Sequence, residues 1–401
     1  MGLGDKYDLA IVGSGIIGIS AGIAALESNP RLKVLILDKE RIPGAHASGR
    51  NSGVLHAGFY YSPESLKARF CKEGNVELKK FARNSNVPIN SCGKVVVARN
   101  HEEVKRLELL FQRGIANGVQ IELLKESKLR EFDSSARTVE KFIWSPNTSV
   151  VEPKALLSKL LEHYLVLGGK IEFNSRVSLQ VDGEEVLVVL NGAFLNATKV
   201  INSAGAYSDL LAREIGVGIN YAAIPFKGNY RKSGRSTTSK TLVYPVPHPI
   251  NPFLGVHTTL TPEGFLKIGP TAMIALGREN YRGLSGIEFH ELVEILKSVI
   301  ILAKSSKHDI LEILKLEFPL LFARELIREA AQLSTAVSGQ AKWERTQSGI
   351  RSQLVDVRSG ELVQDFVVER YSNSLHFLNL VSPGWTSAFP FTRYFVHEFI
   401  Q

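Results

Sequence analysis

The stretch over residues 7–27 limits the possible folds most strongly, because residues 9–26 carry no charge. A run of about 18 apolar residues is close to the length that spans a bilayer. Three glycines, Gly13, Gly15 and Gly18, divide this run at G-x-G-x-x-G spacing. The pattern predicts a short buried strand, a tight turn and a helix, which together form the first half of a dinucleotide-binding unit.

The three glycines have different expected roles in such a unit. The first allows the turn, the second lets the backbone approach a pyrophosphate, and the third lets the helix pack against the strand. The phosphates then lie at the helix N-terminus, where backbone N–H groups lack partners. A secretion signal is disfavoured, since Asp5 and Asp8 stand where its basic region belongs and no A-x-A cleavage site follows.

A second predicted strand, LKVLILDKE, contains Asp38 near its end, 20 positions after Gly18. This is the spacing of the acidic residue that binds a nucleotide ribose in dinucleotide-binding units. The alternative interpretation is that Asp38 only caps the end of the strand. The spacing favours the ribose ligand.

Three separated pieces of sequence look like strand-to-loop contacts of one cofactor. They are residues 13–18, the pair Ala204-Gly205, and residues 382–387. A long cofactor that crosses a whole domain requires contacts from such distant segments. This dispersion favours FAD over NAD.

The chain has 401 residues, which is enough for two domains, and its 44% hydrophobic and 22% charged residues are ordinary for a globular protein. Because we find no linker or low-complexity tract, we expect interleaved domains in a mixed α/β (α+β) fold. We expect a Rossmann-type FAD-binding domain from residues 1–85, 150–218 and 345–401. An antiparallel-sheet substrate domain then takes residues 86–149 and 219–344.

Cysteine content and charge exclude some classes of protein. Cys71 and Cys92 cannot form a disulfide framework, which suits a reducing cytoplasm, and no metal-ligand spacing is present. The net charge of +8 raises the alternative of a nucleic-acid-binding protein. No aromatic-interleaved basic stretch supports it, so we expect no nucleic-acid partner. A basic surface also favours anionic substrates or anionic lipids.

Local patterns predict several further elements. A capping signal at Asn100 starts a helix, and the turn pairs at residues 182–183 and 191–192 predict hairpins. Residues 288–328 are helical and aliphatic in pattern. Two of their apolar segments either form core helices of the second domain or dock on a lipid surface as a peripheral contact.

Several long motifs are spread along the chain, within a similarity that runs from residue 7 to residue 387 and is weak only over about residues 284–347: GRNSGVLHAGFYYSPESLKA, INSAGAYSDLLA, IPFKGNY, YPVPHPINPFLGVHTT, IGPTAM, GIRSQLV, DFVV and SPGWTS. Together they resemble the D-amino-acid-oxidase-like (glycine-oxidase-type) flavoproteins, and within them the L-2-hydroxyglutarate dehydrogenases/oxidases. The resemblance implies FAD-dependent oxidation of L-2-hydroxyglutarate, or a similar 2-hydroxy acid, to the 2-oxo acid. Quinone or oxygen would accept the electrons. Amino-acid oxidase and glycerol-3-phosphate dehydrogenase activities remain alternatives.

The motifs and this resemblance also imply a set of cofactor-binding residues. The N-terminus of the last helix would stabilise negative charge on reduced flavin. The expected FAD-binding residues are Gly13, Gly15, Ile16, Gly18, Asp38, Lys39, Ser48, Asn51, Ser52, Gly53, Val177, Ala204, Gly205, Arg351, Pro383, Gly384, Thr386 and Ser387.

Oxidation of a hydroxy acid requires a base for the hydroxyl proton, and histidine suits this task because its ordinary pKa is near 6.5. His257, in FLGVH, and His56, in the flavin loop, lie in family-like motifs. We expect His257 to be the base. The resemblance leaves three roles open for His56: contact with the flavin ring, a part in catalysis, or covalent attachment to the flavin.

A dicarboxylate substrate requires cations at both ends. We expect Arg351 and Lys227 to share the two carboxylates, because both lie in matched motifs, with Lys67 and Arg278 as reserves. Three tyrosines could donate hydrogen bonds to the substrate, although core packing explains them equally well: Tyr60, Tyr230 and Tyr244.

Overall fold

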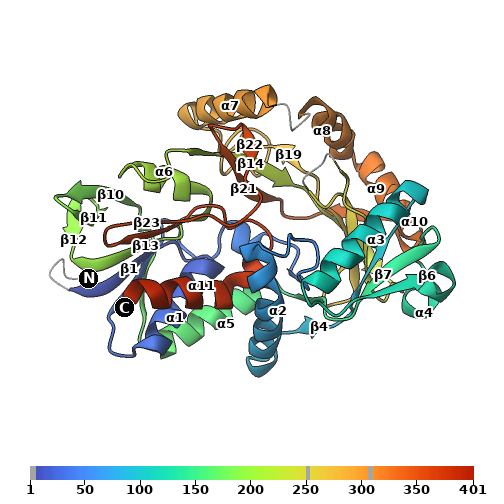
Figure 1. The fold of residues 1–401 in the computed structure, drawn as a ribbon, viewed down its shortest axis with the longest axis horizontal. Helices are drawn as coiled ribbons and strands as arrows, with labels where there is room; N and C mark the ends of the chain where they lie inside the picture. Colours follow the sequence, from blue (N-terminus) through green and yellow to red (C-terminus); the bar gives the residue numbers. More distant parts are fainter. Residues whose placement is uncertain (1–5, 250–252, 306–309) are drawn as a thin grey trace.

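The computed structural model describes residues 6–249, 253–305 and 310–401. Its elements form two connected regions, one around the opening glycine motif and the other around a large antiparallel sheet (Figure 1). Residues 250–252, which belong to the motif YPVPHPINPFLGVHTT, lie outside the described residues.

The first region contains a six-stranded sheet in which β1 (Tyr7–Val12) lies between two parallel neighbours. One neighbour, β2 (Val34–Leu37), follows β1 through helix α1 (Ile16–Ser28), which confirms the predicted strand–turn–helix–strand unit. The other, β13 (Ala197–Asn202), returns from the middle of the chain. Three outer strands complete the sheet: β9 (Lys170–Glu172), β24 (Ser374–Phe377) and β23 (Val368–Tyr371).

Strand β1 is buried on both faces, which explains its continuous apolar sequence. Leu9 and Ile11 pack against the helices on one side of the sheet, whereas Ala10 and Val12 pack against a smaller sheet on the other. The charge-free run is therefore a strand and a helix of the protein core. None of the helices in the described ranges is both long enough and apolar enough to cross a membrane.

Two layers cover the six-stranded sheet (Figure 1). On one face, α1 packs with three further helices: α2 (Leu66–Asn84), α5 (Pro153–Val166) and α11 (Gly384–Ile400). On the other face lie α6 (Ser208–Arg213) and a small antiparallel sheet: β10 (Val177–Asp182), β11 (Glu185–Leu190) and β12 (Ala193–Leu195). Both predicted hairpins join the strands of this sheet, with positive φ at Gly183, Asn191 and Gly192.

The second region is built on an eight-stranded sheet whose neighbours are antiparallel, except that β5 and β16 run parallel. Helix α3 (His101–Ala116) packs against its outer strands, and α9 (Ala323–Ala331) packs beside α10 (Thr335–Ser338). The strands, in spatial order, are β20 (Trp343–Arg345), β15 (Arg231–Ser236), β18 (Phe265–Gly269), β17 (His257–Leu260), β16 (Leu242–Pro245), β5 (Lys94–Val97), β7 (Lys141–Ser145) and β6 (Glu122–Lys125).

The predicted helix at Asn100 is α3, and the Asn100 Oδ1 accepts a hydrogen bond from the Glu103 N–H at 2.9 Å. The aliphatic segment over residues 288–328 is helical where it is described, although it is broken into shorter pieces. These pieces are α7 (Phe289–Lys304), α8 (Ile310–Glu317), the 3-10 turn η4 (Phe318–Leu321) and the start of α9.

Two smaller sheets join the regions. One contains β19 (Met273–Ile274), β14 (Tyr221–Gly228), β21 (Gly349–Asp356) and β22 (Glu361–Leu362); the other contains β3 (Val54–Leu55), β8 (Ser149–Val151) and β4 (Ile89–Asn90). Strands β14 and β21 pair along their whole length, although they come from opposite sides of the boundary expected between residues 344 and 345. The connections between regions are therefore sheet hydrogen bonds, and the domain limits given above stay a proposal.

Candidate active site

A cleft lies where the carboxyl ends of β1 and β13 meet the large sheet. Most of the expected site residues line it, from segments far apart in the sequence: Gly13, Gly15, Ile16, Asp38, Lys39, Ser48, Asn51, Ser52, His56, Ala204, Gly205, Tyr230, Tyr244, His257, Arg351, Pro383, Gly384 and Thr386. The remaining expected residues lie outside the lining: Gly18, Gly53, Tyr60, Lys67, Val177, Lys227, Arg278 and Ser387.

The glycine turn leaves an open surface at its centre. A Cβ atom on Gly13, whose φ is +102°, would lie 2.5 Å from the Ser203 carbonyl oxygen, and one on Gly18 would lie 1.9 Å from the Gly13 oxygen. These two glycines allow close backbone packing. At Gly15 an added Cβ would meet only the Ser48 hydroxyl, at 3.0 Å. Gly15 therefore faces the cleft at the N-terminus of α1, where a phosphate would bind.

Hydrogen bonds tie the surrounding loops to this turn. The Ser48 hydroxyl accepts from the Ile16 N–H at 3.0 Å, and the Trp385 indole N–H donates to the Ser48 carbonyl at 3.1 Å. Asp38 accepts from the Ser14 N–H at 2.6 Å and keeps its place in the cleft wall. The flavin-loop segment, the turn and the start of α11 thus form one wall.

These residues fit a dinucleotide such as FAD. The open face at Gly15 and the α1 N-terminus suit a pyrophosphate, and the Asp38 carboxylate suits a ribose. At the other end of the cleft, two buried imidazole nitrogens, His56 Nδ1 and His257 Nε2, have no hydrogen-bond partner. Since unpaired buried polar atoms are costly, this end suits a ligand with polar groups.

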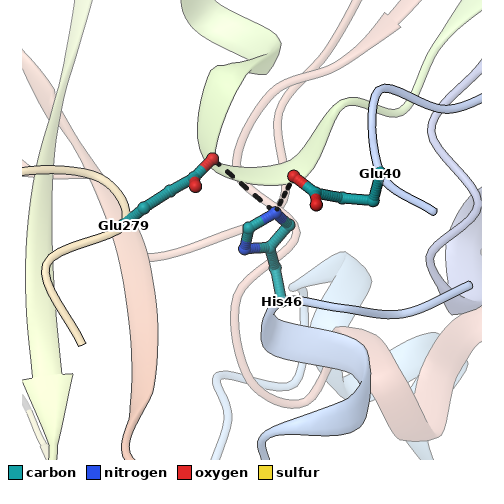
Figure 2. Close-up of side chains that lie close together, drawn as sticks. All are labelled: Glu40, His46 and Glu279. Atoms are coloured by element: carbon teal, nitrogen blue, oxygen red, sulfur yellow. Dashed lines mark hydrogen bonds and ion pairs between the residues drawn. The ribbon is translucent and has the colours of Figure 1, made fainter. Parts of the chain in front are cut away.

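Five side chains form a polar clamp beside the cleft: Lys39, Glu40, His46, Glu279 and Tyr281. His46 lies between the two glutamates, with its Nε2 3.0 Å from Glu40 Oε1 and 3.6 Å from Glu279 Oε1 (Figure 2). Its Nδ1 lies 2.8 Å from the Tyr281 hydroxyl, and the Lys39 ammonium pairs with both glutamates. The clamp joins the segment after β2 to the segment after β19.

Three residues of the clamp, Glu40, His46 and Glu279, present possible metal ligands close together. The Lys39 ammonium, however, already contacts both carboxylates and offsets part of their negative charge. We therefore assign the clamp to the contact between the two regions and not to a metal ion.

His257 has the geometry of a proton acceptor. Its Nδ1 lies 2.9 Å from the Gly255 carbonyl oxygen, so Nδ1 carries the proton and donates it to that oxygen. Its Nε2 then holds the lone pair, and it is the buried nitrogen without a partner. The imidazole stacks on the Tyr244 ring, with ring centres 3.8 Å apart, which fixes its orientation.

The electrostatic surroundings keep His257 neutral. Burial lowers the pKa of His257 to about 3, and the positive charges of Lys94, Arg351 and Lys267 act in the same direction. For His56, burial is also the largest cause and keeps the pKa well below its ordinary value, with Lys94 and His257 contributing. Both imidazoles are therefore neutral near pH 7, which is the form that accepts a proton.

The four expected cations lie in different surroundings. Arg351 lines the cleft, with its guanidinium 4.9 Å from the centre of the Phe253 ring. Lys227 lies outside the lining, and its ammonium donates to the backbone and side-chain oxygens of Asn280, both at 3.0 Å. Arg351 is therefore the better placed of the two expected carboxylate ligands.

The two reserve cations do not suit substrate binding in these positions. Arg278 is buried and forms an ion pair with Asp209 at 2.6 Å, so its charge is already balanced. Lys67 is buried beside Asp365, and burial lowers the pKa of Lys67 to about 8. Neither side chain lines the cleft, so the contacts give no support to these two residues as reserve substrate ligands, and that role stays a prediction.

Other expected residues outside the lining support the wall. A Cβ on Gly53 would lie 2.1 Å from the Val151 carbonyl oxygen, so this glycine lets the flavin loop pack closely. Val177 begins β10 in the small sheet, and the Ser387 side chain is buried within α11. Tyr60 lies in the core below the cleft.

Sequence reasoning missed Lys94, which begins β5 and is completely buried. A lysine next to the apolar run VVVA would ordinarily be read as the exposed end of a strand. The signal that could have been noticed is that cysteine, glycine and valine surround it, with no acidic residue nearby in the sequence.

Comparison with known proteins gives consistent matches over nearly the whole chain. Residues 8–397 match the family model described as FAD dependent oxidoreductase. A protein named L-2-hydroxyglutarate dehydrogenase from Indibacter alkaliphilus is 35% identical over 395 residues, which cover 95% of this chain and 96% of the relative. One of the same name from Salmonella houtenae is 32% identical over 397 residues, covering 98% and 93%. The mitochondrial protein of that name from Caenorhabditis elegans is 34% identical over 415 residues, covering 99% and 94%.

Solved structures share the fold at lower sequence identity. Glycine oxidase from Geobacillus kaustophilus superposes with a TM-score of 0.74 at 18% identity and covers 98% of this chain and 94% of its own. L-alpha-glycerophosphate oxidase from Mycoplasma pneumoniae, solved with FAD bound, gives a TM-score of 0.72 at 22% identity and covers 99% and 95%.

Proposed function

Because this chain belongs to the family of FAD-dependent oxidoreductases, we propose that it oxidises L-2-hydroxyglutarate, or a closely similar 2-hydroxy acid, to the 2-oxo acid. The observation that carries this proposal is the Nε2 of His257, an unpaired proton acceptor in the wall of the cleft that also contains the glycine turn. The names of relatives at 30–35% identity over nearly the full length support the same substrate.

In the proposed reaction, bound FAD supplies the acceptor for the hydride that leaves C2 of the hydroxy acid. His257 Nε2 accepts the hydroxyl proton, while its Nδ1–H bond to Gly255 keeps the ring in the correct tautomer. Arg351 binds a carboxylate, because guanidinium can donate two parallel hydrogen bonds to it. Tyr244 keeps the imidazole in place by stacking. In the cofactor half, the N-termini of α1 and α11 favour negative charge.

A panel of substrates tests the proposed specificity. A charge-assisted hydrogen bond to the distal carboxylate contributes roughly 1.5–3 kcal/mol, so L-2-hydroxyglutarate should be preferred to L-lactate by about 10–100-fold in kcat/KM. If Arg351 binds the carboxylate next to the hydroxyl, Arg351→Met should lower kcat/KM for both acids. If Arg351 binds the distal carboxylate, the variant should instead reduce the preference for L-2-hydroxyglutarate over L-lactate. Lys227→Met is the matched test of the second expected cation.

Other outcomes of the panel would point elsewhere in the family. Faster turnover of glycine or another amino acid would favour an amino-acid oxidase, and faster turnover of glycerol 3-phosphate would favour a glycerol-3-phosphate dehydrogenase. Equal rates on L-2-hydroxyglutarate and L-lactate would contradict a site for two carboxylates.

We propose that the electrons then pass to a quinone or to oxygen, and that the protein works in the cytoplasm as a peripheral partner of the membrane. Cys71 and Cys92, both free thiols, support a reducing compartment. Helix α7 carries an exposed apolar stripe formed by Phe289, Leu296 and Ile300. Lys297 and Lys304 of the same helix are also exposed. Such a face suits a surface of anionic lipid, where a quinone is accessible. Residues 306–307, at the end of the first expected lipid-docking segment, lie outside the described residues.

Vesicle sedimentation tests this surface. The protein should bind vesicles that contain anionic phospholipid and bind much less to neutral ones. Phe289→Ser combined with Ile300→Ser should abolish the binding while flavin reduction in solution stays unchanged, since neither side chain lines the cleft. Equal sedimentation of the variant and the wild type would remove the proposed docking face.

A further inference from the structure

Lys94 is a buried ammonium group surrounded by aromatic rings. Its side chain is 0% exposed, and its Nζ lies 4.6 Å from the centre of the Phe59 ring, 4.5 Å from that of Tyr60 and 4.7 Å from that of Tyr244. The Nζ has no hydrogen-bond partner, and no carboxylate in the described part of the chain pairs with it. Cation–π contacts with these rings offset only part of the cost of burying the charged ammonium.

This aromatic cage lies directly behind the cleft wall. Lys94 on β5 pairs with Leu242 on β16, and Tyr244 follows Leu242 by two residues on β16. The side chains of Lys94 and Tyr244 therefore project from the same face of the sheet. Tyr244 lines the cleft and stacks on His257. One aromatic ring therefore separates the ammonium from the candidate base.

Because Lys94 is buried without a counter-charge, its charged form is destabilised relative to its neutral form. Burial lowers the pKa of Lys94 to about 7, so a neutral and a charged population coexist near neutral pH. An anion in the cleft would supply the missing opposite charge and favour the charged form. The same charge also favours the neutral state of His257 and of His56.

We propose that Lys94 takes up a proton when a carboxylate ligand enters the cleft, so that ligand binding and Lys94 protonation are coupled. This inference rests on the proposed function in that it takes the substrate to be an anionic acid. The proton comes from the solvent and converts the neutral amine to the ammonium, and no other bond changes. Lys94 does not line the cleft, so its charge acts on the ligand from behind the Tyr244 ring, without direct contact. We therefore describe Lys94 as a positioning residue.

The other titratable groups around Lys94 stay uncharged near neutral pH. Burial raises the pKa of Tyr60, of Tyr244 and of the Cys71 thiol on α2, and it lowers the pKa of both nearby histidines. On β7 the residue opposite Lys94 is Ser145, which does not titrate.

Two more cations act on His257: Lys267 on the neighbouring strand β18, and Arg351 on β21 of another sheet. Arginine stays charged at all these pH values. Burial lowers the pKa of Lys267 to about 8, with Glu152 opposing the shift, so Lys267 requires its own variant in the test.

The test is calorimetric titration of the oxidised holoenzyme with glutarate, a dicarboxylate without the hydroxyl group that would be oxidised. Titration in buffers of different ionisation enthalpy gives the number of protons taken up. Near pH 7 the wild type should take up part of one proton per glutarate. At pH values above the pKa that Lys94 has in the ligand-free enzyme, the Kd for glutarate should rise by at most about tenfold per pH unit, because one proton is coupled to binding.

Variants assign the proton to Lys94. Lys94→Met should bind glutarate weakly, with no proton uptake and no pH dependence in this range. Lys94→Arg, which keeps the charge, should bind without uptake and keep its affinity at higher pH. Lys267→Met should retain the uptake seen near pH 7, and so should the control Lys199→Met, whose lysine contacts Phe399 away from the cleft.

Three results would overturn the coupling: no proton uptake by the wild type, undiminished uptake by Lys94→Met, or no binding of glutarate. Flavin reduction by L-2-hydroxyglutarate would survive any of these results, and then only the inference about Lys94 fails. If glutarate binds with proton uptake but no hydroxy acid reduces the flavin, the coupling stands and the proposed function fails.

Discussion

Replacing His257 with alanine will slow reduction of the bound FAD by L-2-hydroxyglutarate by about 10²–10⁴-fold, the usual effect of removing a general base. The loss follows from the geometry, because Nε2 is a buried proton acceptor with no other partner and Nδ1 is committed to Gly255. Substrate affinity should change little, since we propose that Arg351, and not His257, binds the carboxylate. Anaerobic stopped-flow absorbance measures the reduction rate and the apparent Kd separately.

His56→Ala is the matched comparison, because His56 is also buried, neutral and in the cleft wall. We expect a smaller effect on the rate from this change. An unchanged rate in His257→Ala together with loss of reduction in His56→Ala would show that the other histidine is the base. Acid precipitation of the wild type should release its FAD, and retention of the flavin would instead indicate covalent attachment.

Replacing Gly15 with valine will yield a folded protein without FAD. An added Cβ at Gly15 meets only the Ser48 hydroxyl, at 3.0 Å, so the side chain projects into the cleft where a pyrophosphate approaches. Flavin absorbance of the purified variant measures the loss, and circular dichroism checks the fold. Gly18→Val differs, because its Cβ would lie 1.9 Å from the Gly13 carbonyl oxygen, and it should reduce the amount of folded protein.

Gly339→Val is the control for the Gly15 variant. Gly339 is exposed, and an added Cβ there meets nothing closer than 3.6 Å, so the variant should keep its full FAD content. Normal FAD content in Gly15→Val, measured on protein purified with ample flavin, would contradict the assigned pyrophosphate site.

The parts of the fold that the sequence predicts correctly are those decided by short-range patterns. The charge-free opening run, its three glycines and the strand ending near Asp38 each depend on neighbours within about 30 residues, and the structure confirms the resulting β1–α1–β2 unit. The hairpin at residues 191–192 is confirmed for the same reason, because Asn and Gly adopt the positive φ that its turn requires.

The parts that sequence reasoning missed depend on long-range pairing. Arg278 is occupied by Asp209, 69 residues away, and the clamp joins Lys39 to Glu279, 240 residues away. No local pattern distinguishes such cations from free ones, so the sequence kept Arg278 and Lys67 as reserve substrate ligands. Lys94 shows the opposite error, because a lysine beside a valine run is ordinarily exposed and here it is buried.

The sequence predicts interleaved regions, and the residue boundaries given for them stay a proposal. Absence of a linker suggested a chain that crosses between regions several times, and the parallel pairing of β13 with β1 shows one such return. The pairing of β21 with β14 across the expected boundary could not be read from the sequence, because strand partners depend on the assembled sheet.

A single-turnover reaction of the yellow holoenzyme with L-2-hydroxyglutarate in the absence of oxygen tests the proposed oxidation most directly. An equimolar amount of the acid should bleach the flavin, and 2-oxoglutarate should form in the same amount as reduced FAD. The D enantiomer should leave the flavin oxidised. A flavin that stays oxidised with the L acid, yet is reduced by an amino acid or by glycerol 3-phosphate, would contradict the proposed function.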